Sequence, residues 1–528
     1  MTSKPQASLG RQIAQSTGIV MASVMLSRVL GFCREWTVAH QVGSNATTDA
    51  YYAAFTLPDF LNYLVAAGSL SVTFIPVFSK YLAEKNEEEG WRVFSIVVTF
   101  MGMVLVAAVI LAEIFAPQVV AAIAPGFGPA EKMHVVSLTR LMLPEQFCFY
   151  MGGILSAVQY AKNRFIVPSL APLIYNIGII ACGVALSRRI GITGFAVGVL
   201  AGSITGNFLL QVYGAKRAGA RFLPSLRIGH PGFKMFVKLA IPIMLALSLS
   251  FTDDWIIRWF GSYLQAASIT WLSYAKTLMR VPLGVVGQAI GVASFPVLAQ
   301  LYSEKRYEEL DRILSGTMKG LILLLVPITA LTVGQSVPLV HLVFSHTRLH
   351  EADLLATAAT LAWFSMGMFA WGAQNILARA FYAMRDTITP AVVGTALTFL
   401  NIPVYWLLVR RAQHIGLAIA SSIGISAYTV ILFALLLRRT HGSGARGLVG
   451  FLGKVVIAAA AGGAASWKIV SLLGEHFSWL RFSGAFLDLC VATLAGLLLT
   501  ALLCKLLGVK EMDAYLCRIF SPALRARG

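Results

Sequence analysis

Long apolar runs separated by short polar breaks follow one another along almost the whole chain. Each run is roughly 20 residues or longer, the length an α-helix needs to cross the hydrocarbon core of a bilayer. The pattern predicts about fourteen transmembrane helices and therefore an all-α polytopic membrane protein. The runs lie near residues 17–41, 49–79, 93–123, 133–160, 166–187, 191–214, 234–260, 265–300, 313–343, 354–382, 388–409, 414–437, 449–473 and 482–508.

Two pairs of segments repeat at nearly the same spacing. FIPVFSKYLAEKNEEE, which contains Pro76, resembles SFPVLAQLYSEKRYEE, which contains Pro296, at an offset of 220 residues. ILSAVQYAKNRFIVP (154–168) aligns with ILARAFYAMRDTITP (376–390) at nearly the same offset. We therefore expect a duplicated six-helix unit. Because six is an even number of spans, the two lobes should be related by an axis along the membrane normal, in a parallel repeat, with the substrate site between them.

These signals predict four parts. The N-terminal lobe, with helices 1–6, covers 1–215, and a basic cytoplasmic linker follows at 216–233. The C-terminal lobe, with helices 7–12, covers 234–440, and 441–528 holds two further helices and a cytoplasmic tail. The first apolar run is longer than the core of a signal peptide and has no clear cleavage site, so we expect it to be retained as a span.

Composition agrees with a membrane protein. The 528 residues are 57% hydrophobic and 12% charged, with a mean hydropathy of +0.75, far from the values of soluble proteins. The net charge of +19 would suit a nucleic-acid partner, but the basic residues fall mostly in alternate connections, as the positive-inside rule produces. We therefore expect no nucleic acid as partner and both termini in the cytoplasm.

Arginines within the first apolar run are the strongest functional signal. A charge at mid-bilayer costs roughly 2.5–3.5 kcal/mol, so such residues usually line a polar interior. Arg28 and Arg34 point about 120° apart on a helix, so both could face one wide cavity. A guanidinium binds phosphate oxygens bidentately, which makes phosphate the expected ligand. In the alternative interpretation, each arginine pairs with a carboxylate on another span and only holds helices together.

Acidic residues accompany these arginines. Asp49 opens the second apolar run, where an acid also complements the helix dipole, so a purely structural role competes with one in transport. Asp59 lies deeper and is expected to pair with a cation of the cavity. Arg140 and Glu145, five residues apart on the fourth run, do not share a face, and each should find a partner on another helix.

The second lobe has its own charges. Lys276 and Arg280 lie one turn apart on the eighth run, an arrangement that favours nearby acids or an anionic ligand. Asp253 on the seventh run, with Asn401 on the eleventh, is a candidate site for a monovalent cation. The chain contains no P-loop, zinc signature or nucleophile motif, so we expect no catalytic residue, metal or cofactor.

Several motifs, in order along nearly the whole chain, resemble the lipid II flippases of the MurJ (MviN) family. They are Ser27-Arg28-Val29-Leu30-Gly31-Phe32 with Arg34, Thr48-Asp49-Ala50, Leu57-Pro58, Gly68, Phe74-Ile75-Pro76, Tyr274-Ala275, Pro282-Leu283-Gly284-Val285, Phe295-Pro296, Arg379-Ala380-Phe381-Tyr382-Ala383, Asp386 and Thr389-Pro390.

The resemblance implies a fold and a function. The family belongs to the multidrug/oligosaccharidyl-lipid/polysaccharide exporter superfamily, with two six-helix lobes and two additional C-terminal helices that form a groove associated with the lipid tail. It implies that Arg28, Arg34 and Asp49 are required to flip a polyprenyl-pyrophosphate-linked peptidoglycan precursor across the bacterial cytoplasmic membrane for cell-wall synthesis. The expected partners are lipid II or a related glycolipid, membrane lipids and cell-wall synthesis proteins. The membrane potential is the expected driving force, and coupling to a monovalent cation stays open.

The sequence also departs from the family. Asn62-Tyr63 stands where the family usually has two arginines, and Lys276-Thr277 stands where it usually has Asp-Arg. Arg280 lies one turn from Thr277, so we hypothesise that Arg280 or Lys276 supplies the missing charge. The departures leave room for another polyprenyl-linked glycan as cargo or for a non-transporting scaffold. A drug/cation antiporter of the same superfamily should have mainly acids in its cavity, and a membrane enzyme should have clustered acids or histidines at one interface.

Overall fold

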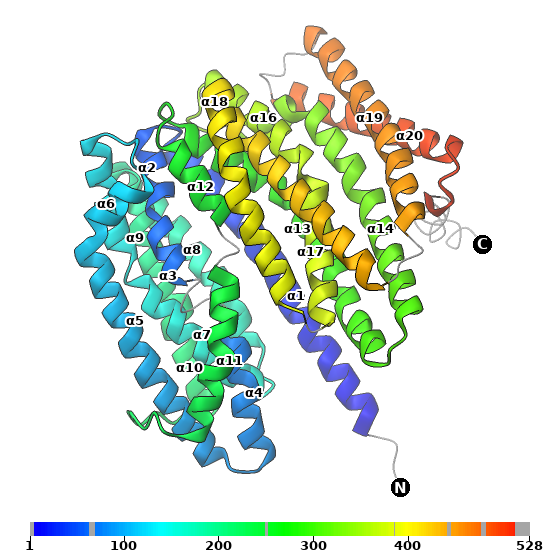
Figure 1. The fold of residues 1–528 in the computed structure, drawn as a ribbon. Helices are drawn as coiled ribbons and strands as arrows, with labels where there is room; N and C mark the ends of the chain where they lie inside the picture. The colour runs from blue at the N-terminus through cyan, green and yellow to red at the C-terminus, as the bar shows by residue number, and fades with distance from the viewer. Residues whose placement is uncertain are drawn as a thin grey trace. The chain divides into compact units, whose positions relative to one another are not determined.

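The computed structural model describes residues 5–62, 69–248, 252–384, 386–440, 445–476 and 482–512. Within these ranges every regular element is a helix, which confirms the predicted all-α class for this part of the chain (Figure 1). The chain divides into two compact units, Met1–Thr270 and Trp271–Gly528. The predicted lobe boundaries at 215 and 234 stay a prediction.

The first unit contains most of the described helices. They are α1 (Pro5–Gln41), α2 (Ala46–Ala54), α3 (Thr56–Leu61), α4 (Ser69–Ala83), α5 (Glu87–Ile123), α6 (Pro129–Met142), α7 (Glu145–Ala161), α8 (Ile166–Ile190), α9 (Thr193–Gly202), the π-helical η2 (Ser203–Leu209), α10 (Leu210–Arg217), α11 (Pro231–Ser248) and α12 (Thr252–Gly261).

The second unit begins within the first turn of α13. Its helices are α13 (Ser268–Ser303), α14 (Tyr307–Gly334), α15 (Ser336–Phe344), α16 (Glu351–Met366), α17 (Met368–Ala383), α18 (Ile388–Thr440), α19 (Ala445–His476) and α20 (Phe482–Leu506). The predicted boundary between the runs 388–409 and 414–437 falls inside α18. There Gln413 has non-helical dihedral angles, φ 47° and ψ −128°.

Eight described helical runs are long and apolar enough to cross a membrane, and α16 with α17, bent by 42°, makes a ninth. This confirms a multi-pass membrane protein, while the count of fourteen stays a prediction. The predicted run 49–79 is not one helix. Pro58 lacks the N–H that would donate to the Ala54 carbonyl, and the Thr139 hydroxyl of α6 donates to that carbonyl instead, at 3.2 Å.

A second interruption lies within one candidate span, Pro129–Ala161. α6 ends at Met142 and α7 begins at Glu145, so Leu143 and Pro144 separate the two helices. The break places Glu145 in the first turn of α7, a position that the apolar pattern alone does not reveal.

The sequence repeat is visible in the backbone of two turns. Lys85, after α4, and Lys305, after α13, have positive φ angles of 56° and 58°. In both turns the following N–H donates at 2.9 Å to a carbonyl five residues back, from Asn86 to Tyr81 and from Arg306 to Leu301. The second pair of repeated segments has the same bond, from Arg164 to Gln159 at 2.8 Å and from Asp386 to Phe381 at 3.0 Å. The repeated sequence segments therefore share local backbone geometry.

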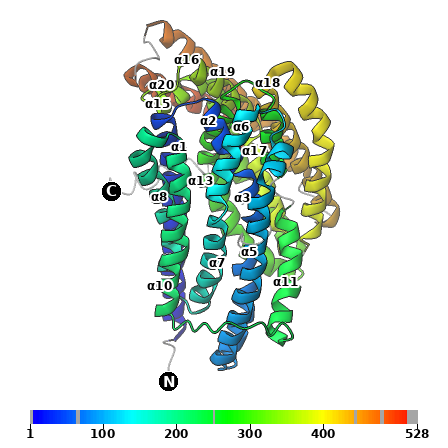
Figure 2. The same ribbon diagram turned by 90° about the vertical axis from the view of Figure 1, so that its left-hand side faces the viewer.

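The basic linker between α10 and α11 is extended and crosses the end of the first unit (Figure 2). The N–H of Leu223 donates to Ser95 Oγ at 3.1 Å and that of Ser225 to Thr99 Oγ1 at 3.3 Å, both on α5. His230 Nε2 lies 2.7 Å from Glu89 Oε1. These contacts fasten the linker to α5 before α11 begins.

Candidate functional site

Arg34 forms an ion pair with its neighbour on α1. Arg34 Nη2 lies 2.6 Å from Glu35 Oε1, and the Tyr52 hydroxyl on α2 donates to Glu35 Oε2 at 2.5 Å. Arg34 Nη1 also donates to Asn176 Oδ1 on α8, at 3.4 Å. The Glu35 side chain is 8% exposed and that of Arg34 is 26% exposed. The guanidinium is therefore bonded from its own helix and from α8, and it is the more accessible member of the ion pair.

Arg28 lies six residues earlier on α1 and has a different environment. Its side chain is exposed, and it makes no hydrogen bond or ion pair with any residue that the structure describes. Arg34 does pair with an acid, but this acid lies on its own helix and not on another span. The alternative in which each arginine joins two helices through an acid therefore describes neither arginine among the described residues. A ligand at Arg28 displaces no described protein partner, whereas a ligand at Arg34 competes with Glu35.

Asp49 stabilises the start of α13. Its Oδ1 accepts hydrogen bonds from the Thr270 N–H at 2.7 Å and from the Thr270 hydroxyl at 2.6 Å. The carboxylate is 3% exposed, and it satisfies N–H groups that an α-helix leaves without a partner at its beginning. Asp49 lies in the first turn of its own helix, as predicted, but its hydrogen bonds link α2 to a helix 221 residues away.

Asp59 pairs with a cation, as the sequence predicts. Arg258 on α12 donates to Asp59 Oδ2 through Nη1 at 3.2 Å and through Nη2 at 3.3 Å. Nη1 also donates to the Thr56 hydroxyl at 3.1 Å. The pair joins α3 to α12, and Asn62, the last described residue before the gap at 63, ends α3 half-buried.

Arg140 and Glu145 each find a partner on another helix, as predicted. Arg140 Nε lies 3.8 Å from Glu113 Oε2 and donates to the Glu113 carbonyl at 3.1 Å. Glu145, which is 2% exposed, accepts from the Tyr175 hydroxyl of α8 at 3.3 Å. Because it is buried, Glu145 is a candidate functional residue. The sequence analysis did not select it as a site residue.

In the second unit, α13 carries Lys276 and Arg280. Lys276 is 7% exposed, and its Nζ lies 5.6 Å from the centre of the Trp371 ring and 5.8 Å from that of Phe364. Such contacts stabilise an ammonium by cation–π attraction. Arg280 is exposed. The replacement of the missing family charge by either residue stays a hypothesis.

The two residues of the candidate cation site belong to different units. Asp253 is half-buried in the first turn of α12, in the first unit. Asn401 is 9% exposed in the second unit, and its Nδ2 donates to the Ala420 carbonyl at 2.9 Å, across the two limbs of α18. Asn401 therefore has a packing role within its own unit, and its pairing with Asp253 stays a prediction.

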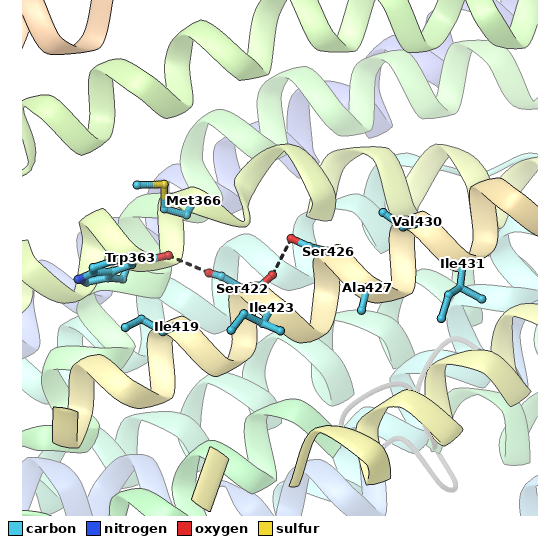
Figure 3. Close-up of a pocket in the computed structure, with 9 residues that line it drawn as sticks. All are labelled: Trp363, Met366, Ile419, Ser422, Ile423, Ser426, Ala427, Val430 and Ile431. Atoms are coloured by element: carbon cyan, nitrogen blue, oxygen red, sulfur yellow. Dashed lines mark hydrogen bonds between the residues drawn. The ribbon is translucent and has the colours of Figure 1, made fainter. Parts of the chain in front are cut away.

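Two apolar grooves lie on the second unit. One, of about 590 Å³, lies between α14, α16, α17 and α19 and includes Phe369 and Trp467. The other, of about 570 Å³, lies between α16 and α18 (Figure 3). In the second groove the Ser422 hydroxyl donates to the Trp363 carbonyl at 2.8 Å and Ser426 to the Ser422 carbonyl at 2.7 Å. Because backbone carbonyls satisfy these hydroxyls, the grooves present mainly hydrocarbon.

Apolar helices with ion-paired charges in one unit and apolar grooves on the other are features of helical membrane transporters. Solved structures share the fold. An inward-facing multidrug resistance MATE family transporter of the MOP superfamily matches with a TM-score of 0.61 and 12% identity, over 80% of this chain and 98% of that chain. The lipid II flippase MurJ in an inward closed conformation matches with a TM-score of 0.76 and 21% identity, over 92% and 98%.

The chain belongs to the lipid II flippase MurJ family, whose sequence profile matches residues 38–483. The probable lipid II flippase MurJ of Haemophilus influenzae is 28% identical over 508 residues, which cover 92% of this chain and 98% of that protein. The lipid II flippase MurJ of Burkholderia cenocepacia is 27% identical over 435 residues, covering 80% and 83%. The resemblance inferred from the motifs is confirmed, and with it the assignment to a family of transporters rather than enzymes.

Proposed function

We propose that this chain moves lipid II from the inner to the outer leaflet of the bacterial cytoplasmic membrane by alternating access. The observation that carries the proposal is the family match across residues 38–483, which covers the helices that hold Asp49, Asp59, Arg258 and Lys276. The proposed architecture has fourteen spans, two six-helix lobes in parallel repeat and two C-terminal helices. The equivalent turns at Lys85 and Lys305 support the duplication.

The headgroup binds through its pyrophosphate. Arg28 provides an accessible guanidinium, and Arg34 provides a second one when the pyrophosphate takes the place of Glu35. Two guanidinium groups match the two phosphates, because each forms bidentate hydrogen bonds. Glu35 keeps its hydrogen bond from Tyr52 in that state, which limits the cost of losing Arg34.

The polyprenyl tail stays in hydrocarbon. The groove between α14, α16, α17 and α19 supports this arrangement, because α19 is one of the two C-terminal helices and the lining is mainly apolar. A tail along such a groove keeps its own surface away from water while the headgroup crosses. The two parts of the cargo thus interact with chemically different surfaces.

The membrane potential favours export. Each elementary charge that crosses it is worth about 2.3 kcal/mol per 100 mV, so two phosphate charges moved outward gain up to about 4.6 kcal/mol when the inside is negative. The charge distribution of the connections supports cytoplasmic termini, and hence an inward-open state that loads from the cytoplasm.

Complementation tests this function. A strain depleted of its own lipid II flippase should grow when it expresses the wild-type chain, and should fail with Arg28→Ala at equal protein level. Arg189→Ala removes an exposed arginine at the end of α8 and should still restore growth. Lack of growth with a well-expressed wild type would reject lipid II as cargo and favour another polyprenyl-linked glycan.

A further inference from the structure

Glu145 lies in the middle of a candidate span. It opens α7 directly after the Leu143-Pro144 break, equally far from both ends of the run Pro129–Ala161. Its side chain is buried, with 2% of the residue exposed. An ionised carboxylate at this depth is costly unless a cation or several good hydrogen bonds compensate its charge.

The partners of this carboxyl group are neutral. The Tyr175 hydroxyl donates to Oε2 and Gln146 Nε2 donates to Oε1, both at 3.3 Å. No basic side chain in the described ranges comes within ion-pair distance of Glu145. Two long hydrogen bonds from neutral groups compensate a full negative charge poorly.

Three other acids of the first unit have a cationic partner. Glu35 has Arg34 at 2.6 Å, Asp59 has Arg258 at 3.2 Å, and Glu113 has Arg140 at 3.8 Å. Asp49 also has only neutral donors among the described residues, but its two hydrogen bonds from Thr270 are short, at 2.7 and 2.6 Å, whereas both bonds to Glu145 are 3.3 Å long. Glu145 therefore combines burial with weak bonds from neutral groups. They fit a protonated carboxyl group, because a tyrosine oxygen can accept the hydrogen bond that a carboxylic acid donates.

Titratable groups on several helices act on Glu145. They are Arg34 on α1, Tyr51 on α2, Asp59 on α3, Tyr175 on α8 and, on α7 itself, Cys148. Arg34 and Glu145 bond consecutive residues of α8: Arg34 Nη1 donates to Asn176 Oδ1 at 3.4 Å, and the Tyr175 hydroxyl donates to Glu145 at 3.3 Å. A cation held beside a carboxyl group favours its ionised form. An anion bound at Arg34 would cancel the effect of the guanidinium and so strengthen proton binding at Glu145.

We propose that the Glu145 carboxyl is a proton-binding site of the transport cycle, which holds its proton more tightly when an anionic headgroup occupies Arg34. The link to the headgroup rests on the proposed function, while the proton site rests on the surroundings of Glu145. Water supplies the proton, and only an O–H bond of the carboxyl forms or breaks. Because linkage is reciprocal, a lower pH tightens headgroup binding by the factor with which the headgroup tightens proton binding.

Infrared spectroscopy of the purified full-length protein tests the proton site without a transport assay. The wild type should show at neutral pH a carbonyl band of a protonated carboxyl group that Glu145→Gln removes. Asp488→Asn is the matched control: Asp488 is buried on α20, neither of its oxygens has a hydrogen-bond partner among the described residues, and its replacement should leave the Glu145 band in place. Should Glu145→Gln fail to fold, Tyr175→Phe replaces it. Loss of the hydrogen bond to Tyr175 should change the frequency and the titration midpoint of the Glu145 band.

Farnesyl pyrophosphate tests the link to the headgroup. Its addition should move the midpoint of the Glu145 band to higher pH by about one unit in the wild type, and should not move it in Arg34→Ala. A Glu145 that is ionised at neutral pH, or a band that depends on sodium rather than on pH, would overturn the proton site. A wild-type titration midpoint that does not move when farnesyl pyrophosphate is added would overturn the coupling. Failure of complementation by a protein with the expected band would reject the cargo and leave the proton site standing.

Discussion

Described charged side chains of the two units differ in their surroundings. In the first unit, Arg34 pairs with the adjacent Glu35 on α1 and Arg258 of α12 pairs with Asp59 of α3, so cations and acids neutralise each other. In the second unit, Lys276 lies against the rings of Phe364 and Trp371. The first unit thus concentrates paired charges that an anionic headgroup could rearrange, while the second presents aromatic and apolar surfaces suited to hydrocarbon.

The two units share backbone geometry at their repeated turns, although their side chains make different contacts. The turns at Lys85 and Lys305 have the same hydrogen bonds, yet their side chains interact differently. After the first turn, Glu89 contacts His230 of the linker, whereas after the second, Arg306 bonds the nearby Glu304 and Glu309. The repeated segments therefore share local geometry, and the tertiary surroundings determine which contacts their side chains make.

The largest expected effect comes from breaking an ion pair of the first unit. Arg258→Ala leaves the Asp59 carboxylate without this cation and should lower the free energy of unfolding by about 2–3 kcal/mol. Lys276→Met in the second unit keeps most of the side-chain volume, removes a cation–π contact and should cost about 1 kcal/mol. Denaturation of the purified variants measures both.

A double variant sharpens this result. Arg258→Ala combined with Asp59→Asn removes the charge that the single change strands, so it should recover part of the lost stability. Equal losses for Arg258→Ala and Lys276→Met would contradict the contrast between the units.

The next effect concerns packing in the second unit. A Cβ at Gly463 on α19 would lie 2.7 Å from the Ala330 carbonyl oxygen of α14, so Gly463→Ala should destabilise the protein by about 2 kcal/mol through overpacking. Gly453, on the same helix, has no atom within 4 Å of the corresponding position. Gly453→Ala is the matched control and should be neutral or stabilise α19 by about 0.5–1 kcal/mol. Thermal unfolding of the two variants compares them directly, and similar midpoints would exclude close helix packing at Gly463.

The smallest expected effect concerns the second repeated turn. Although burial opposes it, hydrogen bonds from Thr389 and the nearby Arg439 guanidinium hold the pKa of Asp386 below its usual value. Because the pKa is lower in the folded state, Asp386 stabilises the fold above its unfolded pKa, and this contribution is lost as the pH falls through the folded pKa. Asp386→Ala should therefore cost about 1 kcal/mol at neutral pH and less in acid.

The pH dependence of unfolding measures that difference. Asp386 accepts from the N–H groups of Ile388 and Thr389 at the start of α18, while Arg164, at the equivalent place in the first unit, donates to the Arg217 carbonyl at 2.5 Å. Arg164→Ala should cause a loss that does not change between neutral and acidic pH. A loss for Asp386→Ala that is also independent of pH would show that its charge contributes nothing.

Local chemistry made much of this protein predictable. Apolar runs of spanning length determined an all-α membrane protein, and the duplicated segments identified turns whose backbones agree. Ordered motifs around Arg28, Asp49 and Pro76 were enough to indicate the family, because neighbouring residues in the chain carry each motif. The pairing of Asp59 with a cation followed from the cost of a lone buried charge.

Only the tertiary structure decided which charges meet. Arg34 bonds the adjacent Glu35, a spacing at which helical side chains do not ordinarily face each other. Asp49 reaches Thr270, and Glu145 reaches Tyr175 but no described cation. Helix periodicity specifies the face on which a side chain lies, whereas the packing of helices distant in sequence determines what that face contacts. The partner of each buried charge, and with it the charge's chemistry, is therefore a property of the folded chain.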